Sequence, residues 1–152
     1  MKLVFDTSVW VDHLRADALA SVIPALRGRF SLWFDSVASA ELLGGCRSKA
    51  ERRQVKKLLD PFRRARRVAH PLESDFLRAA SAISRLRESG RTLKNPGAAL
   101  LDGLIAAVCC RMGALVVTAN VSDFELLALE MPLRVETFTA FRHRLLGQSV
   151  TP

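Results

Sequence analysis

Short apolar runs alternate with helical segments along this chain, and that alternation limits the folds it can adopt. Runs of strand length are found at Lys2 to Phe5, Ser31 to Phe34, Arg67 to Ala69, Leu115 to Thr118 and Leu133 to Glu136. The segments between them are long enough to return the chain to the same end of a sheet. We therefore expect an α/β domain in three layers, with a central, mostly parallel sheet of about five strands flanked by helices.

The intervening segments have helical patterns. We expect helices at about Val9 to Arg27, 37 to 45, 47 to 59, Leu72 to Glu88, Ala98 to Met112, Asp123 to Leu129 and Thr137 to Leu146. Pro24 should break or kink the first helix, and Pro61 should end the third. Ser122 and Glu125 fit a capping box for the sixth. The apolar face expected on the fourth consists of Leu72, Phe76, Ala79, Ala80, Ile83 and Leu86.

The length of 152 residues fits one domain, which we expect over residues 1–147 with a C-terminal tail at 148–152. No apolar stretch approaches the roughly 20 residues needed to span a bilayer, so no membrane association is expected. The first apolar run reaches Asp6 after three apolar residues, too few for a secretory signal. The three cysteines have no metal-ligand spacing. These features favour a cytoplasmic location.

Positive charge is concentrated in one stretch. Residues 47–67 contain ten Lys and Arg residues and two acidic ones, which accounts for the whole net charge of +8. Such a stretch in an otherwise neutral domain is typical of a surface that meets a polyanion or an acidic partner. A solvated helix face is the alternative.

Several acidic residues stand in positions that allow two interpretations. Asp6 and Asp35 each follow an apolar run, so each can cap a helix. Glu41 can be a solvated helix residue, although apolar residues surround it. Asp102 lies within the apolar segment Ala98 to Val108, where a charge is costly unless it is paired or metal-bound. The alternative for Asp102 is a first-turn carboxylate favoured by the helix dipole.

A cluster of such carboxylates would have a specific chemical consequence. Carboxylates within about 4 Å repel one another by several kcal/mol, so a cluster requires protonation or a cation. Oxygen ligands without suitably spaced His or Cys select Mg²⁺ or Mn²⁺ over zinc. His13, His70 and His143 share no ligand spacing. The sequence therefore favours a hard divalent cation if these carboxylates come together.

Four segments together resemble the PIN-domain ribonuclease toxins called VapC, members of type II toxin-antitoxin systems. The segments are Phe5 to Trp10, Ser39 to Leu42, Leu101 to Ala107 and Val117 to Glu125. Their order and separations are similar to those of that family over essentially the whole domain. The resemblance implies a PIN-like fold in which the catalytic, metal-binding residues are Asp6, Glu41, Asp102 and Asp123. It implies that the supporting polar residues are Thr7, Ser8, Thr118 and Asn120. Whether Asn120 or Asp123 fills the fourth acidic position stays open.

The same resemblance implies a Mg²⁺- or Mn²⁺-dependent endoribonuclease. Its partners would be an RNA substrate, a cognate VapB-like antitoxin that blocks the acidic pocket, and a second copy in a homodimer. The residues expected to bind RNA or antitoxin are Arg47, Lys49, Arg52, Arg53, Lys56 and Lys57. A catalytically silent RNA-binding module on the same fold is the alternative function.

Two other classes of enzyme fit the sequence poorly. A haloacid-dehalogenase-like phosphatase also begins with an apolar strand and an Asp, but its chemistry needs a second Asp two residues later. Ser8 occupies that position. No Gly-rich phosphate loop with a Lys is present, which disfavours nucleotide hydrolases.

Overall fold

Five parallel strands form one sheet in the order β3-β2-β1-β4-β5. The computed structural model describes residues 1–147, so the expected tail at 148–152 lies outside the described residues. The strands are β1 (Lys2–Phe5), β2 (Ser31–Asp35), β3 (Val68–Ala69), β4 (Leu115–Thr118) and β5 (Arg134–Thr137). In register, Val4 lies opposite Trp33 of β2 and Val116 of β4. The expected α/β class and five-strand sheet are confirmed, and every strand pair is parallel.

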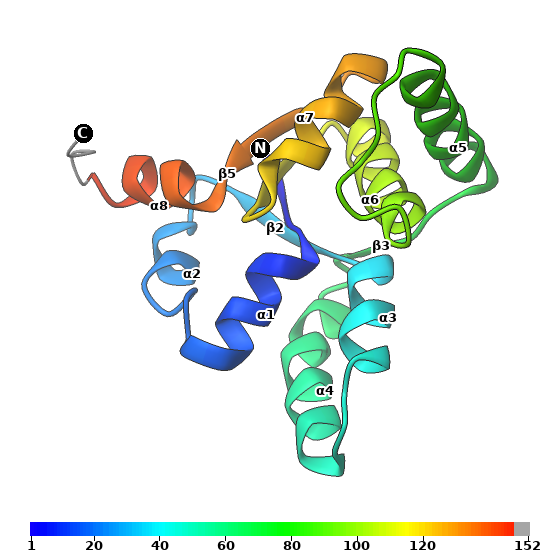
Figure 1. Cartoon of the computed structure of the whole chain (residues 1–152). Coiled ribbons are helices and arrows are strands. Elements are labelled where there is room, and N and C mark those ends of the chain that lie inside the picture. The colour runs from blue at the N-terminus through cyan, green and yellow to red at the C-terminus, as the bar shows by residue number, and fades with distance from the viewer. Residues whose placement is uncertain (148–152) are drawn as a thin grey trace.

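Helices cover both sides of this sheet. They are α1 (Thr7–Ala16), α2 (Val22–Ala25), α3 (Ser36–Gly44), α4 (Lys49–Arg64), α5 (Glu73–Glu88), α6 (Ala99–Met112), α7 (Val121–Glu130) and α8 (Phe138–Leu146). Figure 1 shows α1, α2 and α8 on one side and α5, α6 and α7 on the other, with α3 beside α4 at the carboxyl ends of the strands. The direction of strand order reverses between β1 and β4, so a crevice is expected beyond their carboxyl ends.

An aromatic cluster fixes α1 and α4 against the sheet. Trp10 is fully buried, stacks on Phe34 at 4.5 Å between ring centroids, and meets Phe62 edge-on at 5.8 Å. Its indole Nε1 donates a hydrogen bond to the carbonyl of Phe5 (3.0 Å). Trp10, in the first turn of α1, therefore contacts β1, β2 and α4 at one point.

The break or kink expected at Pro24 and the helix end expected at Pro61 both lie elsewhere in the structure. The first helix ends at Ala16, where Asp17 is left-handed (φ 52) and its carboxylate lies 3.1 Å from His13 Nδ1. Pro24 lies inside the separate helix α2. Pro61 lies inside α4, which continues to Arg64. A proline in a helix interior costs about 3 kcal/mol, and the packing of Phe62 against Trp10 and Phe34 offsets that cost.

Two other expectations on the helices are corrected. On α5, Ala79, Ile83 and Leu86 are buried as expected, whereas the other members of the expected apolar face, Leu72, Phe76 and Ala80, are exposed. Asp75 takes an inner position because Arg111 forms an ion pair with it (2.9 Å). The capping box of Ser122 is wrong, because α7 begins at Val121 and Asn120 is its N-cap residue.

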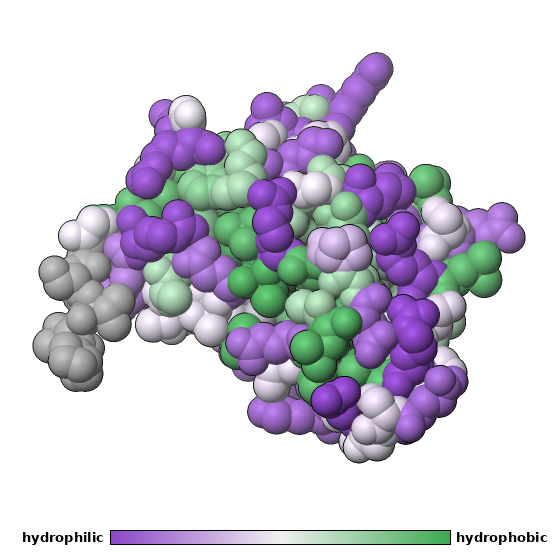
Figure 2. All heavy atoms as spheres, turned by 90° about the horizontal axis from the view of Figure 1, so that it is seen from above, coloured by the Kyte–Doolittle hydropathy of each residue, from purple (hydrophilic) through white to green (hydrophobic). Residues whose placement is uncertain are grey.

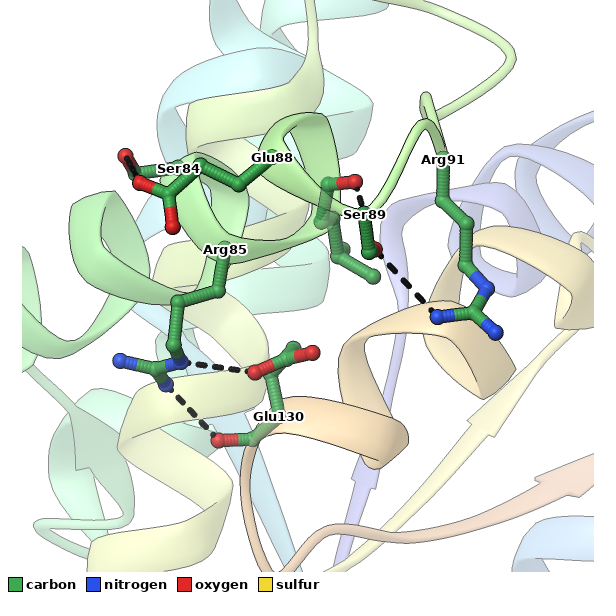
Figure 3. A network of polar contacts seen from close by, with 7 residues as sticks. Ser84, Arg85, Glu88, Ser89, Arg91 and Glu130 are labelled. Atoms are coloured by element: carbon green, nitrogen blue, oxygen red, sulfur yellow. Dashed lines mark hydrogen bonds and ion pairs between the residues drawn. The ribbon is translucent and has the colours of Figure 1, made fainter.

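Close contacts hold α5 against its neighbours α6 and α7. A Cβ on Gly103 of α6 would lie 3.1 Å from the Cβ of Ala79, so a glycine there allows the close approach of α5. Arg85 of α5 donates hydrogen bonds to the carboxylate and the carbonyl of Glu130 at the end of α7 (2.7 and 3.1 Å; Figure 3). The layer formed by α5, α6 and α7 is thereby fixed as a unit.

The surface mixes polar and apolar side chains. Figure 2, which looks down on the molecule from above the view of Figure 1, shows hydrophobic residues interspersed with hydrophilic ones. Within residues 1–147, no helix combines the length and the hydropathy required to cross a membrane.

Candidate active site

Asp6 is held at the carboxyl end of β1 by residues from α1 and β4. It is 4% exposed, and its Oδ2 accepts hydrogen bonds from Ser8 Oγ (2.7 Å) and Thr118 Oγ1 (2.9 Å). The backbone N–H of Ser8 also donates to Oδ2 (3.3 Å), so Asp6 is the N-cap of α1. All three bonds use Oδ2, which leaves Oδ1 with no hydrogen bond from the described residues. Asp6 can therefore cap the helix and still offer an oxygen to a ligand.

Thr7 brings Glu41 to the same place. Thr7 Oγ1 donates a hydrogen bond to Glu41 Oε2 (2.5 Å), which joins the start of α1 to the middle of α3. Burial raises the pKa of Glu41, and the nearby charge of Asp6 raises it further, while the bond from Thr7 acts in the opposite direction. Glu41 is therefore close enough to Asp6 for the two charges to interact.

Asp102 lies in the first turn of α6 and is partly buried. Desolvation is the main cause that raises its pKa to about 7, and the charges of Asp6, Glu41 and Asp123 add to it. No hydrogen bond to its carboxylate is found within the described residues. Among these four carboxylates, Asp102 is thus the one whose negative charge the described residues stabilise least.

Asp123 is fully buried and both of its oxygens have partners. Its Oδ1 accepts a hydrogen bond from the backbone N–H of Lys94 (2.9 Å), and its Oδ2 accepts one from Asn120 Nδ2 (3.2 Å). The first bond ties α7 to the loop between α5 and α6. Asn120 in turn donates its backbone N–H to Thr118 Oγ1 (2.9 Å). Asn120 and Asp123 therefore belong to one network behind Asp6, and both stay candidates for the fourth position.

The atoms that these side chains offer suit a metal ion, but the side chains are not close enough together to form a complete site. Within residues 1–147, no three His, Cys, Asp or Glu side chains lie close enough to form a ready-made metal centre. The donor set is nevertheless all oxygen, which suits Mg²⁺ or Mn²⁺. Asp6 Oδ1 and the Asp102 carboxylate have no competing hydrogen bond from the described residues. These two residues are accordingly the leading candidates to hold such an ion.

The basic residues of the sequence analysis are divided between two grooves. Lys49, Arg52, Arg53 and Lys56 line an open groove of about 270 Å³ on α4. Arg47 lines a larger cavity of about 540 Å³ between α1, α3 and α4, together with Thr7 and Glu41. Lys57 is exposed on α4. Only Arg47 is therefore placed beside a candidate catalytic residue.

Asp35 caps a helix, as its position after an apolar run suggested, but this cap is unusual. Asp35 is fully buried at the end of β2, and its Oδ1 accepts a hydrogen bond from the N–H of Val37 (2.7 Å) as the N-cap of α3. Its Oδ2 has no partner among the described residues. Desolvation raises the pKa of Asp35 to about 7, and the charges of Asp75 and Glu41 contribute. Asp35 caps the helix that carries Glu41, and its burial could not be predicted from the local sequence.

Replacement of Asp35 by Asn should make stability less dependent on pH. Because the folded pKa is higher than the unfolded one, Asp35 favours folding fully below about pH 4, and that contribution is lost as the pH rises towards 7. For one buried group the loss is about 2–4 kcal/mol. Urea unfolding of the metal-free protein at pH 5 and pH 8 should show Asp35→Asn more stable than wild type at pH 8. An unchanged pH dependence, equal to that of the exposed control Asp12→Asn, would contradict this account.

The geometry defines a parallel α/β domain with carboxylates at its carboxyl edge, and the comparisons with known proteins give its family. The model of the PIN domain family matches residues 3–128, and the chain belongs to that family. A comparison with curated protein sequences gave no significant match.

Solved structures share the fold. A chain of VapBC-1 from nontypeable Haemophilus influenzae is 22% identical, with a TM-score of 0.68 over 91% of this chain and 99% of that one. A chain of VapBC2 from Rickettsia felis, solved bound to a DNA fragment from the promoter, is 22% identical, with a TM-score of 0.67 over 91% and 99%. A chain of FitAcB from Neisseria gonorrhoeae is 20% identical, with a TM-score of 0.65 over 89% and 96%. At these identities the likeness concerns the fold.

Proposed function

We propose that this PIN-domain protein is a metal-dependent endoribonuclease and the toxin of a toxin-antitoxin pair. The observation that carries the proposal is that carboxylates at the end of β1 and on α3, α6 and α7 lie near the reversal of strand order, close enough for their charges to interact. Asp102 supports it most directly, because a partly buried carboxylate among three others is costly unless a cation or a proton compensates it.

Each residue has a proposed role in phosphodiester hydrolysis. Asp6 and Asp102 are the principal ligands of Mg²⁺ or Mn²⁺, and Glu41 and Asp123 complete the ligand set or orient the attacking water. Such an ion would make water more acidic and stabilise charge on the phosphate and the leaving oxygen. Four further side chains fix the carboxylates, as their hydrogen bonds support: Thr7, Ser8, Thr118 and Asn120.

The proposed partners are an RNA substrate, a VapB-like antitoxin and a second copy of the chain. The structural neighbours support the antitoxin, since those structures are named as VapBC and FitAB assemblies. The basic residues on α4 support a polyanionic substrate, because Lys and Arg bind backbone phosphates regardless of sequence. We place the protein in the cytoplasm, where such a substrate is found.

A cleavage assay separates this function from a silent RNA-binding module on the same fold. EDTA-treated full-length protein is incubated with cellular RNA in the presence of Mn²⁺, Mg²⁺ or EDTA, and the product ends are sequenced. The proposal predicts defined ends with either metal and none in EDTA. Bound but uncut RNA under all three conditions would favour the silent module.

A further inference from the structure

A second cationic cavity lies on the opposite face of α3 from Glu41. This cavity of about 560 Å³, here called the α3–β3 cavity, is lined by Ser36, Ser39, Ala40, Leu43, Arg63, Arg66, Val68 and His70. Its members come from α3, from the C-terminal end of α4 and the turn after it, and from the edge strand β3 and the residue that follows it. None of these residues belongs to the proposed metal site.

Helix geometry relates this cavity to the candidate active site. The four cavity residues on α3 are spaced i, i+3, i+4 and i+7, so they share one face of this helix: Ser36, Ser39, Ala40 and Leu43. Glu41 is on the other face and lines the cavity that also contains Thr7. The two cavities are therefore separated by about one helix diameter, roughly 10 Å. An extended polymer can occupy both at once.

The lining of the α3–β3 cavity suits a phosphate group. Among the described residues, no carboxylate lies within ion-pair distance of Arg63 or Arg66. Guanidinium groups bind phosphate oxygens in a bidentate manner. Ser36 and His70 add polar groups, and Leu43 and Val68 provide apolar surface on which a sugar or a base can rest. A positively charged groove that follows the backbone is typical of proteins that bind single-stranded nucleic acid.

The backbone of Arg66 is an independent observation. Arg66 has a left-handed conformation (φ 53) immediately after α4, where the N–H of Arg67 donates to the carbonyl of Phe62 (2.8 Å). Helices that end in this way usually have glycine at such a position, because a side chain is strained there. A long cationic side chain in a strained position beside a cavity suggests a functional role for that side chain.

We propose that the α3–β3 cavity binds a backbone phosphate of the RNA at a position remote from the scissile bond, with Arg63 and Arg66 as its anchors. This inference rests on RNA as the substrate of the proposed function. The proposal assigns the basic stretch 47–67 to two surfaces. Arg63 and Arg66 line the α3–β3 cavity. The groove on α4 is lined by Lys49, Arg52, Arg53 and Lys56.

The test measures RNA binding without cleavage. EDTA-treated full-length protein is titrated into a fluorescent single-stranded RNA at several salt concentrations, and the slope of log affinity against log salt is determined. Arg63→Gln and Arg66→Gly should each reduce the magnitude of the slope by about 0.7, the value for one phosphate contact on a single strand. The matched control Arg142→Gln removes an exposed charge on α8, which follows the opposite edge strand, and should leave the slope unchanged.

A stability measurement accompanies the binding assay. Arg66→Gly should raise the melting temperature by about 2–4 °C, because it removes the strain while it removes the anchor. A lower melting temperature would contradict the assignment of strain. Slopes for Arg63→Gln and Arg66→Gly equal to that of Arg142→Gln would overturn the phosphate site and leave the proposed nuclease intact. Failure of the wild type to bind RNA at low salt would overturn both.

Discussion

Asp6→Asn is expected to reduce Mn²⁺-dependent RNA cleavage by at least about 100-fold, because loss of a ligand should exceed the 10–100-fold effect usual for outer-shell groups. The fold should be retained, since Asn also caps helices and its carbonyl oxygen can accept the bonds from Ser8 and Thr118. Initial rates on a defined RNA, measured at saturating Mn²⁺, give the comparison.

The control for this experiment is Asp12→Asn. Asp12 is exposed on the same helix, so its substitution removes an equal charge without touching the carboxylate group. Cleavage by Asp12→Asn should match the wild type. Cleavage by Asp6→Asn within a few-fold of the control would remove Asp6 from the proposed ligand set.

Trp10→Ala is expected to lower the free energy of unfolding by about 3–5 kcal/mol, the range for truncation of a large buried aromatic residue. The substitution removes contacts with Phe34 and Phe62 and the hydrogen bond to the carbonyl of Phe5. Because Trp10 follows Asp6, Thr7 and Ser8 on α1, the loss should also loosen the candidate site. Urea unfolding measures the effect.

Trp10→Phe is the matched variant. It keeps most of the apolar contact and loses the indole N–H, so the carbonyl of Phe5 loses a partner at a cost of about 1–2 kcal/mol. A loss below about 1 kcal/mol for Trp10→Ala would show that this cluster does not hold α1 to the sheet.

The sequence predicted the layers of the fold and several of its details. Apolar runs of strand length separated by helical segments specify a parallel sheet. The strand before Asp6 was found at the expected residues, and the one expected at Arg67 to Ala69 was found at Val68–Ala69. The helix end expected at Pro61 was wrong for a physical reason. Local rules give the cost of a proline, whereas the packing of Phe62 on Trp10 depends on residues far away in the chain.

The sequence proposed which residues belong to the candidate site, but it did not indicate the hydrogen bonds that hold them in place. Asp102 could be singled out because a charge in an apolar helix segment is anomalous by itself. The bonds from Thr118 to Asp6 and from Lys94 to Asp123 join residues far apart in sequence, so no spacing rule indicates them. The same holds for Asp35, whose local sequence matches an ordinary exposed cap. The membership of the catalytic set stays a prediction.

The account depends on a divalent cation held by Asp6 and Asp102. Electron paramagnetic resonance of free Mn²⁺, titrated with EDTA-treated and desalted full-length protein, tests this most directly. The account predicts that the wild type and Asp12→Asn each bind one or two ions and that Asp102→Asn loses this binding. Equal binding by wild type and Asp102→Asn, or no binding by either, would contradict it.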